Sequence, residues 1–176
     1  KQKNEVIWGT HHLPYIAYSI CIVAWIGSNA YFHTDLLPIL GASSAVFMAK
    51  LANLASFSAF AFACYFSYRL LPDQLKNKVR LWQQTFFIIL TFYSLYINFL
   101  PDLTIKHVEI TGPSQFVIEF GPHTKYFFIG LMSFLALTLA NIVALRANSS
   151  KLILTKTNYM IAGILVFMLS TLVMQV

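Results

Sequence analysis

The stretch TKYFFIGLMSFLALTLANIVAL, residues 124 to 145, contains a single charged side chain, Lys125, at its second position. A helix that crosses a bilayer needs about 20 predominantly apolar residues, so this stretch predicts a transmembrane helix. Four further windows of similar length and character lie at residues 12–32, 44–70, 82–100 and 157–176. The sequence therefore predicts an all-α integral membrane helix bundle with about five transmembrane helices.

Composition supports the same class. Of the 176 residues, 58% are hydrophobic and only 10% are charged, which is too apolar for an ordinary soluble domain. The net charge of +6 does not indicate nucleic-acid binding, because the basic residues cluster at the ends of apolar runs instead of forming a stripe. Cys21 and Cys64 both lie inside apolar runs, where we expect small buried thiols and no disulfide.

The distribution of basic residues predicts the orientation in the membrane. Nine of the twelve fall on one side of the predicted bundle and three fall nearer the other. The nine are Lys1, Lys3, Arg69, Lys76, Lys78, Arg80, Arg146, Lys151 and Lys156; the three are Lys50, Lys106 and Lys125. By the positive-inside rule, residue 1 is cytoplasmic and residue 176 lies near the periplasmic side. An odd number of spans, and a first segment that reads as a linker between helices, predict that residues 1–176 form one transmembrane domain of a longer protein.

The connector between the third and fourth windows, PDLTIKHVEITGPSQFVIEFGPH (residues 101–123), is long and patterned. Its segments HVEI and FVIEF alternate polar and apolar residues, and TGPS between them supplies turn residues. This pattern predicts an extracytoplasmic β-hairpin. Open strand edges cannot lie in hydrocarbon, so the hairpin should cover the outer mouth of the bundle as a lid.

Aromatic side chains gather around this connector and at the outer ends of the windows. They are consistent either with an interfacial aromatic belt or with the wall of a cavity for an amphiphilic molecule. From depth and chemistry, Trp25, Asn29, Tyr96 and Gln115 are candidate ligand-binding residues. An amide inside a span needs a partner, and for Asn29 and Asn98 that partner is either another helix or a ligand.

Lys50 lies within the second window, near its outer end. We expect its long side chain to snorkel toward the headgroups, and a pairing with Asp35 is the alternative.

Enzymatic and metal chemistry have little support in the sequence. The histidines fall at the ends of windows, which disfavours haem ligation inside the bundle. A metal site built from His107, Glu109, Glu119 and His123 across the hairpin is geometrically possible but matches no strong signature, so we predict no metal and no catalytic residues.

Several long strings resemble the membrane sensor of LuxN-type receptors, hybrid histidine kinases that detect acyl-homoserine lactone autoinducers. They are KQKNEVIWGTHH, AWIGSNAYFHTDLLP, MAKLANLAS, GPSQFVIEFGPHTKYFFIG and NSSKLILTKTNYMIAGILVFMLST. Together they cover nearly the whole chain. The resemblance implies a nine-span sensor in the bacterial inner membrane, of which the windows here are the second to sixth spans, followed by kinase and receiver domains that this chain lacks.

The resemblance also implies a site and partners. Phe120, Phe127, Phe128 and Leu131 match family segments as an apolar wall, with Asn98 as a polar anchor. The implied ligand is a short-chain, 3-hydroxy acyl-homoserine lactone that sets the kinase/phosphatase balance of a quorum-sensing phosphorelay. A homodimer, a downstream phosphotransfer protein, and ATP with Mg in the kinase domain are implied too. The alternatives are a non-signalling membrane structural subunit and a carrier for a lipophilic solute.

Overall fold

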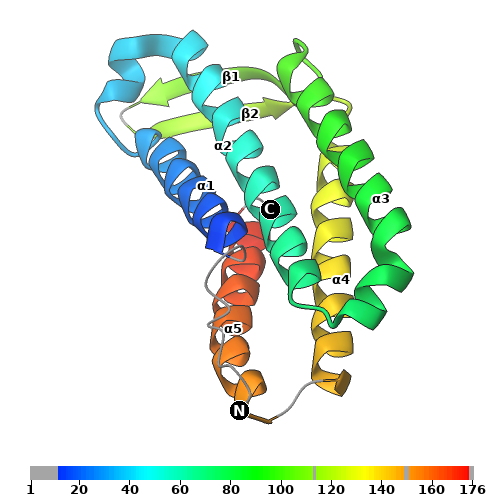
Figure 1. Cartoon of the computed structure of the whole chain (residues 1–176). Helices are drawn as coiled ribbons and strands as arrows, with labels where there is room; N and C mark the ends of the chain where they lie inside the picture. The colour runs from blue at the N-terminus through cyan, green and yellow to red at the C-terminus, as the bar shows by residue number, and fades with distance from the viewer. Residues whose placement is uncertain (1–11, 113, 149–150, 175–176) are drawn as a thin grey trace.

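The computed structural model of the chain describes residues 12–112, 114–148 and 151–174. In chain order its elements are α1 (His12–Tyr31), α2 (Leu36–Arg69), α3 (Asp73–Phe99), β1 (Ile105–Gly112), β2 (Gln115–Phe120), α4 (Thr124–Asn148) and α5 (Lys151–Met174). The strands form an antiparallel hairpin that crosses one end of the helices (Figure 1). The predicted helical architecture with a hairpin between the third and fourth helices is therefore confirmed.

Three helices are long and apolar enough to cross a membrane: Leu13–Tyr31, Leu36–Arg69 and Thr124–Ala147. The early turns of α3 contain four charged residues, and the described apolar stretch of α5, Ile161–Ser170, is shorter than a span. The described residues thus contain three candidate membrane spans, and the count of five transmembrane helices stays a prediction.

The start of α2 corrects the expected boundaries. Residues 33–43 were expected to be a connector, but the helix already begins at Leu36. Pro38 lies in the first turn, where its missing N–H has no intrahelical partner to lose. Gly41 adopts φ 75° and ψ −177°, a conformation essentially restricted to glycine, so the chain kinks there and continues as helix.

The start of α3 differs in the same way. The stretch that follows α2 was expected to be a connector up to residue 81, but the helix begins at Asp73 directly after Pro72. Asp73 lies in the first turn, where its negative charge is favourable beside the unpaired N–H groups. The window was bounded by its apolar residues, but charged residues also extend a helix beyond its apolar stretch.

The core lies along α2, which contacts α1, α3, α4 and β1. Its small buried residues, Ala45, Ala49, Ala52, Ala59 and Ala63, let neighbouring backbones approach closely. Away from the hairpin, aromatic rings fill the interior: Phe57 and Phe134 pack edge to face with centroids 5.2 Å apart. Cys64 is a buried free thiol, whereas the free thiol of Cys21 is only partly buried.

Three polar side chains join α2, α3 and α4 inside this core. The Gln83 Nε2 donates to Asn141 Oδ1 at 2.9 Å, and Asn141 Nδ2 donates to Ser67 Oγ at 3.1 Å. All three residues are buried. Hydrogen bonds of this kind hold helices together where water is excluded, and they fix the side of α3 that faces the bundle.

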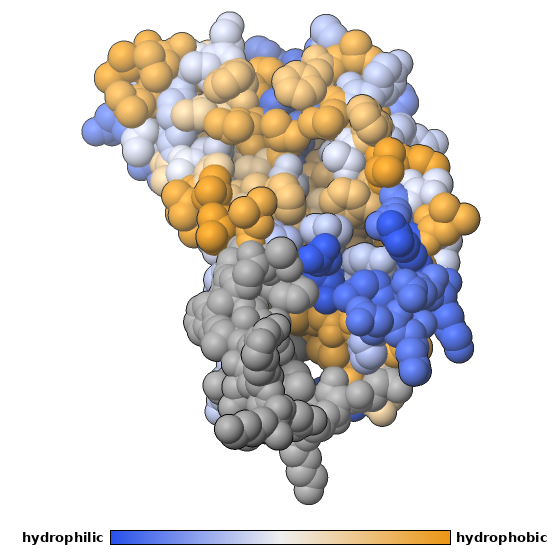
Figure 2. All heavy atoms as spheres, viewed as in Figure 1, coloured by the Kyte–Doolittle hydropathy of each residue, from blue (hydrophilic) through white to orange (hydrophobic). Residues whose placement is uncertain are grey.

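Most of the described basic residues lie at the end of the bundle opposite the hairpin, whereas Lys50, Lys106 and Lys125 lie on or near the hairpin. Figure 2 shows hydrophilic side chains gathered over the start of α3, whereas much of the remaining coloured surface is apolar. Of the nine basic residues predicted to be cytoplasmic, Arg69 lies in the last turn of α2, Lys76, Lys78 and Arg80 in α3, and Arg146 in the last turn of α4, while Lys151 and Lys156 belong to the first two turns of α5. Lys1 and Lys3 lie outside the described residues.

Candidate ligand-binding site

The hairpin packs on the ends of α1 and α2 through one face. Ile105 pairs with Phe120, Val108 with Ile118, and Ile110 with Phe116. Ile105 and Val108 are buried against a cluster that contains Tyr31, Phe32, Leu37, Ala45 and Ala49. The ring of Phe32 lies 4.7 Å from that of Phe116, centroid to centroid. The hairpin is therefore packed against the helices, as predicted for strands whose open edges cannot lie in hydrocarbon.

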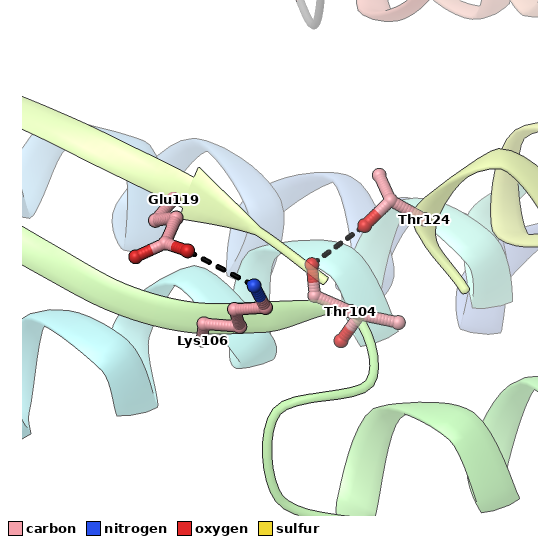
Figure 3. A network of polar contacts seen from close by, with 4 residues as sticks. All are labelled: Thr104, Lys106, Glu119 and Thr124. Atoms are coloured by element: carbon pink, nitrogen blue, oxygen red, sulfur yellow. Dashed lines mark hydrogen bonds and ion pairs between the residues drawn. The ribbon is translucent and has the colours of Figure 1, made fainter. Parts of the chain in front are cut away.

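The base of the hairpin is joined to α4 by backbone and side-chain hydrogen bonds. The Gly121 N–H donates to Thr104 O and the His123 N–H to Leu103 O, both at 2.9 Å. Thr124 Oγ1 also donates to Thr104 O at 2.7 Å (Figure 3). A Cβ on Gly121 would overlap the carbonyl oxygens of Asp102 and Leu103, so only glycine allows this close crossing of the two chains.

A second set of bonds ties this base to α2 and α3. Asn98 Nδ2 donates to Lys50 O at 2.8 Å, and Thr104 Oγ1 donates to Asn98 Oδ1 at 3.1 Å. The helix–helix interpretation of Asn98 is confirmed. The Lys50 ammonium donates to Leu100 O at 3.2 Å and does not pair with Asp35, so that alternative is wrong, whereas snorkelling toward the headgroups stays a prediction. A carbonyl at the C-terminal end of α3 is a favourable acceptor for a cation.

A cavity of about 590 Å³ lies beneath the hairpin, between it and three helices. Its walls come from α1 (Trp25, Ile26, Asn29, Ala30, Phe32 and His33), α2 (Ala49, Ala52 and Asn53), the strands (Ile105, Phe116, Ile118 and Phe120) and α4 (Thr124, Phe127 and Phe128). None of these residues is Asp, Glu, Lys or Arg. The cavity combines a mostly apolar wall, rich in aromatic residues, with a few uncharged polar groups, as small-molecule sites do.

The structure brings together five of the nine candidate site residues: Trp25, Asn29, Phe120, Phe127 and Phe128 all line this cavity. The other four, Leu131, Asn98, Tyr96 and Gln115, do not. Leu131 is fully buried in the aromatic core, Asn98 is committed to the bonds described above, Tyr96 is 61% exposed, and Gln115 is exposed on β2.

The cavity also contains residues that the sequence analysis did not select as ligand contacts, among them Asn53, Thr124 and His33. The sequence could have identified Asn53 as a candidate ligand contact, because it is an amide within an otherwise small and apolar stretch, LANLAS. Only amides near the outer ends of the windows were considered, and Asn53 lies deeper. Thr124 and His33 adjoin helix ends and give no signal in the sequence.

The outer surface of the hairpin is charged but carries no metal cluster. Lys106 Nζ lies 3.0 Å from Glu119 Oε1 (Figure 3), and Lys125 Nζ lies 5.0 Å from the centre of the Tyr126 ring. His107 and Glu119 are paired in the strand register. Within the described residues, however, no group of three or more His, Cys, Asp or Glu side chains is placed to hold a metal ion.

Comparison of the chain with known proteins gives matches among known sequences. No family model matches it, and no solved structure matches it. Over 175 residues, 99% of the chain, it is 72% identical to the autoinducer 1 sensor kinase/phosphatase LuxN of Vibrio campbellii (strain ATCC BAA-1116). The protein of the same name from Vibrio harveyi gives the same identity over the same length. The chain is therefore similar to one segment of these LuxN proteins. It spans 21% of the length of these relatives.

Proposed function

We propose that this LuxN-type chain is the ligand-binding membrane region of an autoinducer receptor, and that ligand binding sets the kinase/phosphatase balance of an attached histidine kinase. The observation that carries the proposal is the 72% identity to sensor kinase/phosphatases along 99% of the chain. The ATP- and Mg-binding kinase, a homodimer and a downstream phosphotransfer protein belong to the same proposal.

The cavity beneath the hairpin is the proposed site, and an acyl-homoserine lactone is the proposed ligand. Such a molecule is neutral and carries a polar ring, an amide and an acyl tail, which suits a wall without charged residues. Each buried methylene contributes only about 0.8 kcal/mol, so a short tail supplies little binding free energy. Selectivity for a tail substituent, such as a 3-hydroxyl group, then depends on the polar groups in the wall, because they are left unpaired by a ligand that lacks it.

The proposed topology has five spans in the bacterial inner membrane, with residue 1 in the cytoplasm and the hairpin outside. Its support is the separation of the hairpin from the basic ends of α2, α3 and α4. Lys and Arg near the ends of spans favour the cytoplasm. The polar residues of α3 are compatible with a span because Gln83 is bonded to Asn141 inside the bundle.

The bonds at the base of the hairpin suggest how binding reaches the helices. Phe116 and Phe120 of the hairpin line the cavity, and the segment that leads into the hairpin is bonded to α3 through Asn98 and to α4 through Thr124. A ligand shifts output only if it binds one arrangement better than another. We propose that closure of the hairpin over the ligand repacks α3 against α4 and favours the phosphatase state.

The test is a set of binding isotherms for acyl-homoserine lactones that differ in chain length and third-carbon substituent, on the full chain in lipid nanodiscs. Saturable, substituent-selective binding that weakens at least tenfold in Phe128→Ala supports the proposal, since about 1.4 kcal/mol of lost contact gives that factor. Phe92→Ala is the matched control, because Phe92 is 70% exposed on α3 and does not line the cavity. Absence of binding by every lactone, in protein shown to be folded, contradicts the proposal.

A further inference from the structure

The asparagines of the helices differ in what their amides already bind. Asn98 and Asn141 are buried and use both the amide nitrogen and the amide oxygen in hydrogen bonds to other helices or to the segment that leads into the hairpin. Asn29 Nδ2 donates to Trp25 O within its own helix at 2.8 Å. Asn53 lines the cavity, and within the described residues its side chain has no hydrogen-bond partner.

Asn53 occupies the end of the cavity that is farther from the hairpin. Ala49 belongs to the cluster on which the hairpin packs, and Asn53 follows it by one helical turn in α2. The neighbouring Ala52 packs with Trp25, which also lines the cavity. The Asn53 amide is therefore a polar group near the depth of the Trp25 indole ring. It lies about one helical turn farther from the hairpin than Ala49.

An amide in an apolar site is unfavourable unless it is hydrogen-bonded, and a ligand that supplies the missing partner removes that penalty. We propose that the Asn53 carboxamide forms a hydrogen bond to one polar group of the neutral amphiphilic ligand and thereby determines selectivity. The inference rests on the proposed function. Asn98, which the family resemblance implies as the polar anchor, is instead a positioning residue that acts through Lys50 and Thr104.

The experiment pairs changes in the protein with changes in the ligand. Affinities of the wild-type full chain and of Asn53→Leu, which keeps a similar volume, are measured in nanodiscs for three probes. They are a 3-hydroxyacyl-homoserine lactone, its unsubstituted analogue, and the analogue whose lactone ring is replaced by a carbocycle. The ligand group that Asn53 contacts is the one whose removal weakens binding to the wild type about tenfold but leaves binding to Asn53→Leu nearly unchanged.

Asn141→Leu is the matched control, because Asn141 is a buried, hydrogen-bonded amide that does not line the cavity; it should lower thermal stability while leaving the wild-type discrimination between probes intact in the folded fraction. Asn53→Gln, which restores a carboxamide, should recover part of the discrimination. If the wild type discriminates between the probes and Asn53→Leu discriminates between them to the same extent, the inference is overturned while the proposed function stands. If the wild type binds none of the probes, the proposed function itself fails.

Discussion

The two ends of the bundle differ in how their polar side chains are hydrogen-bonded. At the end away from the hairpin, aromatic rings pack closely around Phe134, and the amides of Gln83 and Asn141 bond each other. Beneath the hairpin, the same kinds of residue surround a cavity, and the Asn53 amide has no partner among the described residues. Residue type alone therefore does not distinguish a packed core from a binding site. The distinction is whether the polar side chains already have hydrogen-bond partners within the protein.

The largest expected effect is on the packed end. Phe134→Ala should lower the free energy of unfolding by about 3–5 kcal/mol, because Phe134 is fully buried and its removal leaves a void in the aromatic core. Phe128→Ala, the same chemical change in the cavity wall, should cost clearly less. Unfolding in mixed micelles measures both. Equal losses would show that the two ends do not differ in packing.

The next effect concerns the bonded amides. Gln83→Leu should lower stability by about 1–3 kcal/mol because it leaves the buried Asn141 amide short of a partner. The double variant with Asn141→Leu removes both polar groups and should be more stable than the sum of the single changes predicts. A double-mutant cycle on unfolding free energies checks this. Strict additivity would contradict the conclusion that the two amides stabilise the protein by hydrogen-bonding each other.

A smaller effect is expected where α2 bends toward the hairpin. Gly41→Ala should cost about 1–2 kcal/mol, because its φ of 75° is unfavourable for any residue with a Cβ. Gly163→Ala is the matched control: it lies within α5, has open space where a Cβ would be, and should be neutral or slightly stabilising. Thermal unfolding of the two variants decides the matter, and a neutral Gly41→Ala would argue against the kink.

The smallest effect belongs to the surface of the hairpin. Lys106→Met removes the ion pair with Glu119, in which both side chains are about half exposed, so the loss should be about 0.2–1 kcal/mol and should vanish in high salt. Unfolding measured at low and high salt tests it. A large, salt-independent loss would mean that the hairpin depends on this pair more than on the backbone bonds at Gly121 and His123.

Much of the architecture was predictable from local pattern. The apolar windows identify the helices, and the alternation in HVEI and FVIEF identifies the hairpin, because these periods follow from backbone geometry. The starts of α2 and α3 were missed because the windows were chosen by apolar character, and both helices begin before the chosen windows, at Leu36 and Asp73. A proline in a first turn and a glycine at a kink are compatible with a helix that continues, and sequence pattern does not distinguish these cases.

The candidate site was predictable only in part. Phe120, Phe127 and Phe128 were identified from the resemblance, and they line the cavity. Asn98 and Asn53 are both amides within helices, yet one is bonded across helices and the other faces the cavity. No local rule separates them, because successive residues on a helix point about 100° apart and a small rotation of the helix changes what each one meets.

The sequence by itself determined that the chain is an apolar helical membrane protein with a hairpin between two of its helices, since hydropathy, length and alternation are local properties of the chain. Only the tertiary structure decided that the hairpin covers a cavity, that Asn98 joins α2 to the segment before the hairpin, and that Asn53 faces the space below it. These facts depend on how α1, α2 and α4 cross and rotate, which is set by contacts between residues far apart in the chain.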